Sequence, residues 1–108
     1  HLGHYEVEVD GKMLSSWELY QMPHCCGIIV SCATYVDTVY RNKGLGTILN
    51  NFRQDIGRIL GYSLMVCTDI EQNTNQRKLL TKNKWKDLYS FVNKRTTNKV
   101  IISAIDLW

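Results

Sequence analysis

The stretch YRNKGLG, Tyr40 to Gly46, sets two glycines and two basic side chains immediately ahead of a helical pattern. A helix N-terminus has backbone N–H groups without an intrahelical partner, and its dipole is positive there. Glycine lets a bulky anion approach that backbone, because no Cβ stands in the way. Arg41 and Lys43 add positive charge at the rim. The stretch therefore predicts a cradle for a pyrophosphate, and the alternative is a tight turn whose glycines serve packing alone.

The spacing of the glycines excludes two common phosphate-binding loops. A P-loop requires G-x4-G-K-[ST], which the chain does not contain. The dinucleotide fingerprint requires a third glycine, which G-L-G-T-I-L lacks, and no acid ends a following strand at the required place.

The sequence ahead of the cradle predicts strands. Residues 4–20 predict a hairpin, because apolar and polar side chains alternate over residues 5–10 and Asp10-Gly11 is a strong two-residue turn signal. Residues 25–36 form a continuous apolar run rich in β-branched residues. Such a run is typical of a central strand that is buried on both faces.

The sequence after the cradle predicts two helices and three strands. Residues 62–69, 86–92 and 99–107 are expected to be strands, and residues 73–82 a short helix with Leu79 and Leu80 inward. A longer amphipathic helix begins at the cradle and stops at Gly61. Its apolar positions, at helical spacing, are expected to form one buried stripe. They are Leu45, Ile48, Leu49, Phe52, Ile56, Ile59 and Leu60.

The order of these elements predicts a single α+β domain over residues 1–108. The strand–helix–strand unit in the middle should be a right-handed parallel crossover, whereas the flanking hairpins are antiparallel. We therefore expect a mixed, mostly antiparallel sheet with a central parallel pair, in an α/β/α-like arrangement.

Composition excludes several classes of protein. Hydrophobic residues make up 44% and charged residues 21% of the 108 residues, which is a globular balance and not that of a disordered chain. No apolar run is long enough to span a bilayer. The net charge of +3 is too small to indicate a nucleic-acid partner by itself. Residues 41–108 nevertheless hold twelve of the thirteen basic residues, so an anionic ligand would favour that half, unless this is only a solvated basic face.

The four cysteines do not indicate a metal site. They form no C-x-x-C pair, and no His-x3-His partner exists, so zinc is not expected despite the neighbouring His24. We expect buried cysteines that act as small hydrophobes in a reducing cytosol. They are Cys25, Cys26, Cys32 and Cys67.

Two motifs together resemble the GNAT N-acetyltransferases. The family's acyl-coenzyme A loop has the pattern R/Q-x-x-G-x-G/A between a central strand and a long helix, and residues 41–46 read RNKGLG. Val36-Asp37 matches the end of the family's fourth strand, which splays from its neighbour. Downstream, the family has a strand, an Asn and a short helix, matched here by the strand ending near Asp69 and by Asn73. The resemblance covers roughly residues 24–86.

The resemblance implies a site for acetyl-CoA with no metal. The pyrophosphate would rest on the backbone N–H groups of Arg41, Asn42, Lys43, Gly44, Leu45, Gly46 and Thr47. The pantetheine arm would pair like an extra strand with backbone near Thr34 and Val36, and Asn73 would hydrogen-bond it from the other side. An acceptor amine would attack the thioester directly, within a ternary complex, at the splay between strands 25–36 and 62–69.

The chain departs from the family pattern in its proton-transfer groups. Many members carry a tyrosine that protonates the thiolate, and Leu80 stands at the matching position. Lys84 replaces the glycine that ends the short helix, and Asn83 is the alternative left-handed cap. The central strand offers no carboxylate as general base, so the catalytic residues stay open, with Glu18 and His24 as candidates.

The resemblance leaves the acceptor and the assembly open. The family usually opens with a strand and two helices, and only a hairpin precedes the central strand here. This implies either a trimmed chain or a minimal form with an open acceptor cleft. Such a cleft would suit a large acceptor, such as a protein lysine or N-terminus, or a site completed by a homodimer partner. The choice between a small amine and a protein as the acceptor stays open. A cytoplasmic acetyltransferase without membrane or nucleic-acid partners is the expectation. The alternative is a catalytically weak or inactive module that binds CoA or another protein.

Overall fold

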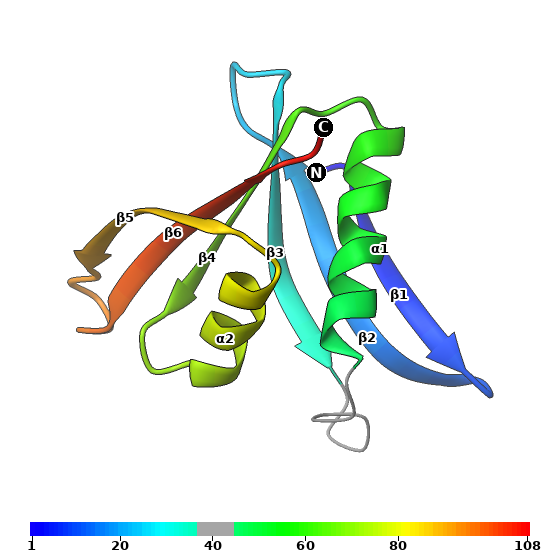
Figure 1. Ribbon diagram of the computed structural model, residues 1–108, viewed down its shortest axis with the longest axis horizontal. Coiled ribbons are helices and arrows are strands. Elements are labelled where there is room, and N and C mark those ends of the chain that lie inside the picture. The colour runs from blue at the N-terminus through cyan, green and yellow to red at the C-terminus, as the bar shows by residue number, and fades with distance from the viewer. Residues whose placement is uncertain (37–44) are drawn as a thin grey trace.

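The computed structural model describes residues 1–36 and 45–108, which form one six-stranded sheet with two helices (Figure 1). The strand order in the sheet is β1-β2-β3-β4-β6-β5. The elements are β1 (Gly3–Val9), β2 (Lys12–Gln21), β3 (Ile28–Val36), α1 (Gly46–Ile59), β4 (Leu64–Ile70), α2 (Thr74–Lys82), β5 (Lys86–Val92) and β6 (Lys99–Asp106). The expected element order is confirmed, and so is the mixed sheet.

The hairpins form at the turns that the sequence indicates. Asp10 and Gly11 both have positive φ, 52° and 78°, which is the backbone twist that a two-residue hairpin turn requires. At the other end of the sheet, Thr97 has φ 61° in the turn between β5 and β6. Each turn joins antiparallel strands, β1 with β2 and β5 with β6.

The parallel pair in the middle of the sheet is short. Only Ile28–Val30 of β3 pair with Leu64–Val66 of β4, and the remainder of β3 continues without β4 as its partner. On its other side β3 stays paired with β2, but the register shifts between Ser16 and Glu18, so two β3 residues face one residue of β2. Such a bulge turns the residues beyond it to the opposite face. The sheet therefore splays in its centre, between β3 and β4.

Both helices lie on the same face of the sheet (Figure 1). The steps from β3 to β4 and from β4 to β5 run in the same direction across the sheet, and a right-handed crossover then places both helices on one side. The core lies between this face and the helices. Its buried members are Trp17, Leu19, Ile29, Tyr62, Met65, Cys67, Leu80, Trp85 and Leu107.

The predicted apolar stripe of α1 is wrong in part. Ile48, Phe52 and Ile59 are 49%, 46% and 83% exposed, whereas the polar side chains of Asn50 and Arg53 are buried. The cause is a close approach at Gly57, one turn after Arg53. A Cβ there would lie 2.9 Å from Leu107 Cδ1 and 3.1 Å from Met65 Cε. The helix therefore packs through its glycine face, and this face carries the polar residues inward.

Three further expectations need correction. β3 begins at Ile28 rather than residue 25, and its face away from the helices is only partly buried, because no helix of the described chain covers it. Of the cysteines only Cys67 is buried, and Cys26 is exposed. The left-handed residue after α2 is Lys84, with φ 68°, since Asn83 has φ −93°.

In the part of the chain that the structure describes, no helix is long and apolar enough to cross a membrane.

Candidate functional site

The predicted cradle lies partly outside the described residues. Arg41, Asn42, Lys43 and Gly44 fall in the undescribed segment, and the structure begins again at Leu45, the N-cap of α1. No side chain caps this helix N-terminus, and its first turn holds no acidic residue. The first-turn N–H groups of α1 thus have no side-chain acceptor among the described residues, which is the condition for binding an anion there.

Gly46 serves the packing of the two helices. A Cβ at this position would lie 2.9 Å from Leu79 Cδ1 on α2. The next residue reinforces the contact, because Asn83 Nδ2 donates to Thr47 Oγ1 at 3.5 Å. The packing role that the sequence left open for the glycines therefore holds for Gly46, and it brings the start of α1 against α2.

A pocket lies between the two helices and the sheet. It opens to solvent, and its cavity volume is about 50 Å³. Of the predicted cofactor-binding residues, it brings together Thr34 and Gly46. Side chains from β2, β3, α1 and α2 line it, namely Ser15, Trp17, Thr34, Gly46, Leu49, Asn50, Arg53, Gln76 and Leu79.

Arg53 is the charged side chain of this pocket, and it is 3% exposed. Its Nη1 donates to Ser31 Oγ at 3.3 Å and to Thr34 Oγ1 at 3.4 Å, and its Nη2 donates to Asn50 Oδ1 at 2.8 Å. The guanidinium carbon lies 5.0 Å from the centre of the Trp85 ring. The bulge in β3 makes this arrangement possible, because it puts Thr34 on the helix side together with Ser31.

Arg53, Asn50 and Gln76 were missed by the sequence-based prediction. Arg53 stands seven residues after Gly46, so the two positions share one helix face. A helical projection taken from Gly46 rather than from the apolar stripe would have found Asn50, Arg53 and Gly57 together.

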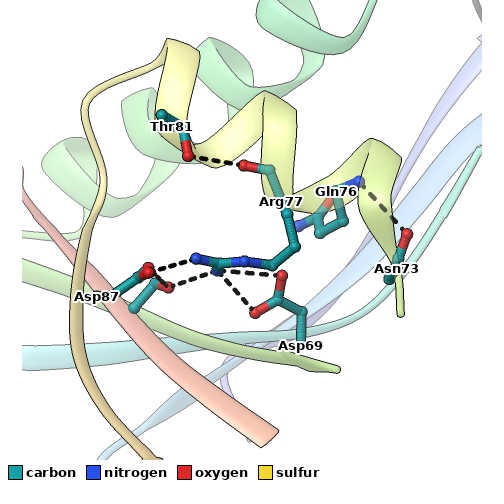
Figure 2. A network of polar contacts seen from close by, with 7 residues as sticks. Asp69, Asn73, Gln76, Arg77, Thr81 and Asp87 are labelled. Carbon is teal, nitrogen blue, oxygen red and sulfur yellow. Dashed lines mark hydrogen bonds and ion pairs between the residues drawn. The ribbon is translucent and has the colours of Figure 1, made fainter. Parts of the chain in front are cut away.

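A second polar cluster anchors α2 to the sheet (Figure 2). Arg77 Nη1 lies 3.2 Å from Asp69 Oδ1 on β4, and Nη2 donates to Asp87 Oδ2 on β5. Ser103 Oγ on β6 donates to Asp87 Oδ1 at 3.0 Å. The hydrogen bond from Arg77 lowers the pKa of Asp87, whereas burial raises the pKa of Asp69 above its ordinary value. The cluster joins α2 to three strands at the open end of the splay.

Asn73 lies at the N-terminus of α2, in the same region (Figure 2). Its Oδ1 accepts from the backbone N–H of Gln76 at 3.3 Å, so the side chain caps the helix. The amide nitrogen of Asn73 is not used by this cap.

Glu18 lies on the face of the sheet that carries no helix. Glu18 on β2 pairs with Cys32 on β3. Cys32 lies two residues beyond Val30, the last β3 residue paired with β4, so Glu18 borders the splay. Tyr20 donates to Glu18 Oε2 at 3.4 Å, and partial burial together with the Glu18 carboxylate raises the pKa of Tyr20 and of Cys32. The other candidate, His24, is exposed in the loop ahead of β3, at the closed end of the parallel pair.

Two more residues, Leu80 on α2 and Cys67 on β4, belong to the core beside the site. Leu80 is 1% exposed and belongs to the core, so it fills space and donates no hydrogen bond. Burial raises the pKa of the Cys67 thiol to about 11, which keeps it protonated at neutral pH. Among the described residues, no group of His, Cys, Asp and Glu side chains is placed to bind a metal ion.

No protein-family model and no curated protein sequence matches the chain. Solved structures do match it. An IAA acetyltransferase from Bacillus cereus superposes with a TM-score of 0.85 at 14% identity, over 95% of this chain and 76% of its own. The ribosomal-protein-S18-alanine N-acetyltransferase from Escherichia coli gives 0.79 at 16% identity, over 96% and 68%.

A GNAT family acetyltransferase from Elizabethkingia anophelis, solved with acetyl-CoA bound, gives a TM-score of 0.85 at 15% identity, over 95% of this chain and 74% of its own. Each of the three similarities covers almost the whole of this chain. The fold of this chain is therefore the acyl-CoA N-acyltransferase fold of the GNAT family.

Proposed function

We propose that the chain is an acetyl-CoA-dependent N-acetyltransferase that transfers an acetyl group to a primary amine. The observation that carries this proposal is the splay between β3 and β4, with a pocket beside it that runs from the start of α1 to β3. A thioester held there is reached by an amine from the helix-free face of the sheet. The fold agrees with this reading, since a similar structure holds acetyl-CoA.

The described residues fit the cofactor. The first turn of α1, together with residues 41–44 ahead of it, would hold the pyrophosphate on backbone N–H groups. Beyond Val30 the edge of β3 that faces away from β2 has lost its strand partner β4, so backbone near Thr34 and Val36 is free to pair with the pantetheine amides. The Asn73 amide would donate from the other side of the arm.

Acetyl-CoA supplies the acetyl group as a thioester, with a thiolate as leaving group. The chain's own contribution is orientation and proton transfer. In the proposed reaction a Glu18 carboxylate oxygen accepts a proton from the incoming amine, directly or through one water, because a protonated amine cannot attack. Backbone N–H groups at the β3 bulge are the proposed donors to the thioester oxygen. Leu80 offers no proton, so water is the proposed source of the proton for the thiolate.

Calorimetric titration with CoA and acetyl-CoA tests the site. The Gln76→Trp variant places a large ring at the pocket mouth and is expected to lose binding, whereas Lys78→Trp, on the exposed side of the same helix, should bind as the wild type does. If the folded wild type binds neither compound, the proposal fails.

Thiol release from acetyl-CoA with a panel of amines tests the chemistry. Glu18→Gln is expected to reduce the rate by roughly 10²–10⁴-fold, the usual contribution of a general base. Glu8→Gln, an exposed carboxylate on β1, is the matched control. Equal rates for both variants would remove Glu18 from the mechanism.

The second candidate function is a GNAT-like module that binds CoA or a protein without catalysis. It rests on Leu80, which leaves the tyrosine position of the family without a proton donor. CoA binding without thiol release across the amine panel would favour this alternative over the enzyme.

A further inference from the structure

The buried polar atoms without a partner gather around one pocket. Among the described residues, four buried side-chain nitrogen atoms make no hydrogen bond, and every one of them is a donor. Three belong to residues that line the pocket, and the fourth belongs to the ring that lies against the Arg53 guanidinium. The four atoms are Trp17 Nε1, Asn50 Nδ2, Arg53 Nε and Trp85 Nε1. A buried donor without an acceptor costs stability, so four in one place call for an acceptor that binds there.

Arg53 adds a charge to these donors. Its hydrogen-bond partners Ser31, Thr34 and Asn50 are all neutral, and no carboxylate of the described residues lies within 4.0 Å of it. Arg77, by contrast, pairs with two carboxylates. Burial lowers the pKa of Arg53, but a guanidinium stays protonated in proteins. The pocket therefore holds a buried positive charge whose counterion is missing from the described chain.

The geometry of the guanidinium selects the kind of anion. Three of its five N–H groups are used, which leaves the one on Nε and one on Nη2. A carboxylate accepts from two neighbouring guanidinium nitrogens at once, and this is the strongest pairing that Arg makes. The Asn50 amide nitrogen and the Trp17 ring nitrogen are further buried, unpaired donors on residues that line the pocket.

The position of Arg53 separates this site from the phosphate cradle. Arg53 stands seven positions after Gly46, about 10 Å along α1 at 1.5 Å per residue. Arg53 also contacts Ser31, which directly follows Val30, the last residue of β3 paired with β4. It thus lies at the inner end of the pocket, beside the splay where the proposed function puts the thioester.

We infer that this pocket binds a carboxylate at the end of the transferred acyl group, so that the chain uses a short dicarboxylic acyl thioester, of the malonyl or succinyl type, in preference to acetyl. The inference rests on the proposed function for the position of the thioester. The bonds that form and break are the same as in acetyl transfer. The amine nitrogen forms the C–N bond, the C–S bond breaks to release the thiolate, and the amine proton goes to the base. The distal carboxylate is unchanged and only pairs with Arg53.

Calorimetry with matched pairs of CoA esters tests this inference. Malonyl-CoA and propionyl-CoA have acyl chains of the same length, as do succinyl-CoA and butyryl-CoA, and within each pair only one carries a carboxylate. The wild type is expected to bind one of the carboxylated esters at least about tenfold more tightly than its partner, as a charge-assisted pair predicts. The Arg53→Met variant should reduce that ratio to about one, whereas Lys78→Met, which removes an exposed charge from α2, should leave it unchanged.

Thermal unfolding of the free protein gives an independent readout. Replacing an uncompensated buried charge by an apolar side chain of similar size is expected to raise the melting temperature of Arg53→Met above that of the wild type. A purely structural role for Arg53 predicts a lower one. If Arg53→Met does not fold, the Arg53→Gln variant, which keeps a polar group, replaces it in the binding test.

Three outcomes overturn the inference. Equal binding of all CoA esters by the wild type removes the carboxylate site but leaves the proposed function standing. No binding of any CoA ester removes the proposed function and this inference with it. In the third outcome, the paired CoA esters bind equally, but with acetyl-CoA as donor amino acids react faster than simple amines of the same length. If the Arg53→Met variant abolishes that difference, the carboxylate that Arg53 binds belongs to the acceptor.

Discussion

Gly57 is a point of close approach between α1 and the core. A Cβ there would meet Leu107, Met65 and Ile29 at 2.9, 3.1 and 3.7 Å, and all three side chains are fully buried. We expect Gly57→Ala to destabilise the protein by roughly 1–3 kcal/mol through overpacking, although alanine is the better helix former. Urea unfolding monitored by circular dichroism measures the change.

The matched control is Asn51→Ala, an exposed position on the same helix, which should change stability by less than about 0.5 kcal/mol. A second variant, Leu107→Ala, removes the nearest contact, so the two changes together should cost about 0.5–3 kcal/mol less than their sum. A Gly57→Ala variant as stable as the wild type would contradict the close approach.

The cysteines differ in reactivity according to their burial. Cys26 is exposed, whereas Cys67 is 3% exposed and burial raises its pKa to about 11. At pH 8 only about one Cys67 in a thousand is then the reactive thiolate. We expect iodoacetamide to label Cys26 in the folded protein well before Cys67, as peptide mass spectrometry would show. As a control, iodoacetamide should label Cys26 and Cys67 at the same rate when the protein is unfolded in denaturant. Equal labelling rates in buffer would contradict the burial of Cys67.

At the residue scale the sequence predicted only part of the site. Gly46 was named from the loop motif, which is local in sequence, and Thr34 from the family resemblance, and both line the pocket. Arg53 was not found, since its role depends on Ser31 and Thr34, about twenty residues away on β3, and on the bulge that turns Thr34 toward it. No pattern within α1 indicates that contact.

At the scale of elements, the strands and helices were predictable because turn residues mark their ends. Asp10-Gly11, Gly61 and Asn73 each have the conformation or hydrogen bond that their residue type favours. The rotation of α1 was not predictable from its apolar stripe. The helix packs through its two glycines and its buried polar side chains instead. The packing on that face outweighs the free energy that burial of Ile48 and Phe52 would contribute.

The rotation of α1 predicts that the mutational cost is uneven along the apolar stripe, to which both Leu49 and Ile59 belong. Ile59→Lys, at a position 83% exposed, should change the free energy of unfolding by less than about 0.5 kcal/mol, although Ile59 belongs to the apolar stripe. Leu49→Ala, at a position 7% exposed, should cost roughly 2–3 kcal/mol. Denaturant unfolding of the two variants and of the wild type measures these changes in the free energy of unfolding. A loss for Ile59→Lys as large as that for Leu49→Ala would mean that the whole stripe faces the sheet.

At the scale of the whole molecule, one face of the sheet carries the helices and the other carries the proposed acceptor side. The pocket with Arg53 lies on the helix face, Glu18 and Cys32 lie on the opposite face, and the splay joins the two. The topology alone produces this division, because consecutive right-handed crossovers in one direction put α1 and α2 on the same side. A donor and an acceptor can therefore approach the same point from opposite faces.

The Arg77 cluster holds this arrangement together, and it makes stability depend on pH. Asp87 has a pKa lowered by its hydrogen bond from Arg77, so its contribution is present above the ordinary aspartate pKa and is lost as pH falls through the folded value. Burial raises the pKa of Asp69, so its carboxyl group takes up a proton more readily in the folded protein than in the unfolded chain. Its contribution to the free energy of unfolding therefore changes with pH in the opposite direction to that of Asp87.

Asp87→Asn separates these two effects. At pH 7 the variant should be less stable than the wild type, by under about 1 kcal/mol, because the Asp87 side chain is 54% exposed and solvent screens the pair. The difference should shrink as pH falls below the ordinary aspartate range and vanish below the folded pKa of Asp87, where the wild-type carboxyl is also neutral. Melting temperatures from pH 2 to 7 measure it, with Asp106→Asn, an exposed aspartate at the end of β6, as control. A difference that stays constant with pH would show that the Asp87 charge does not hold α2 to the sheet.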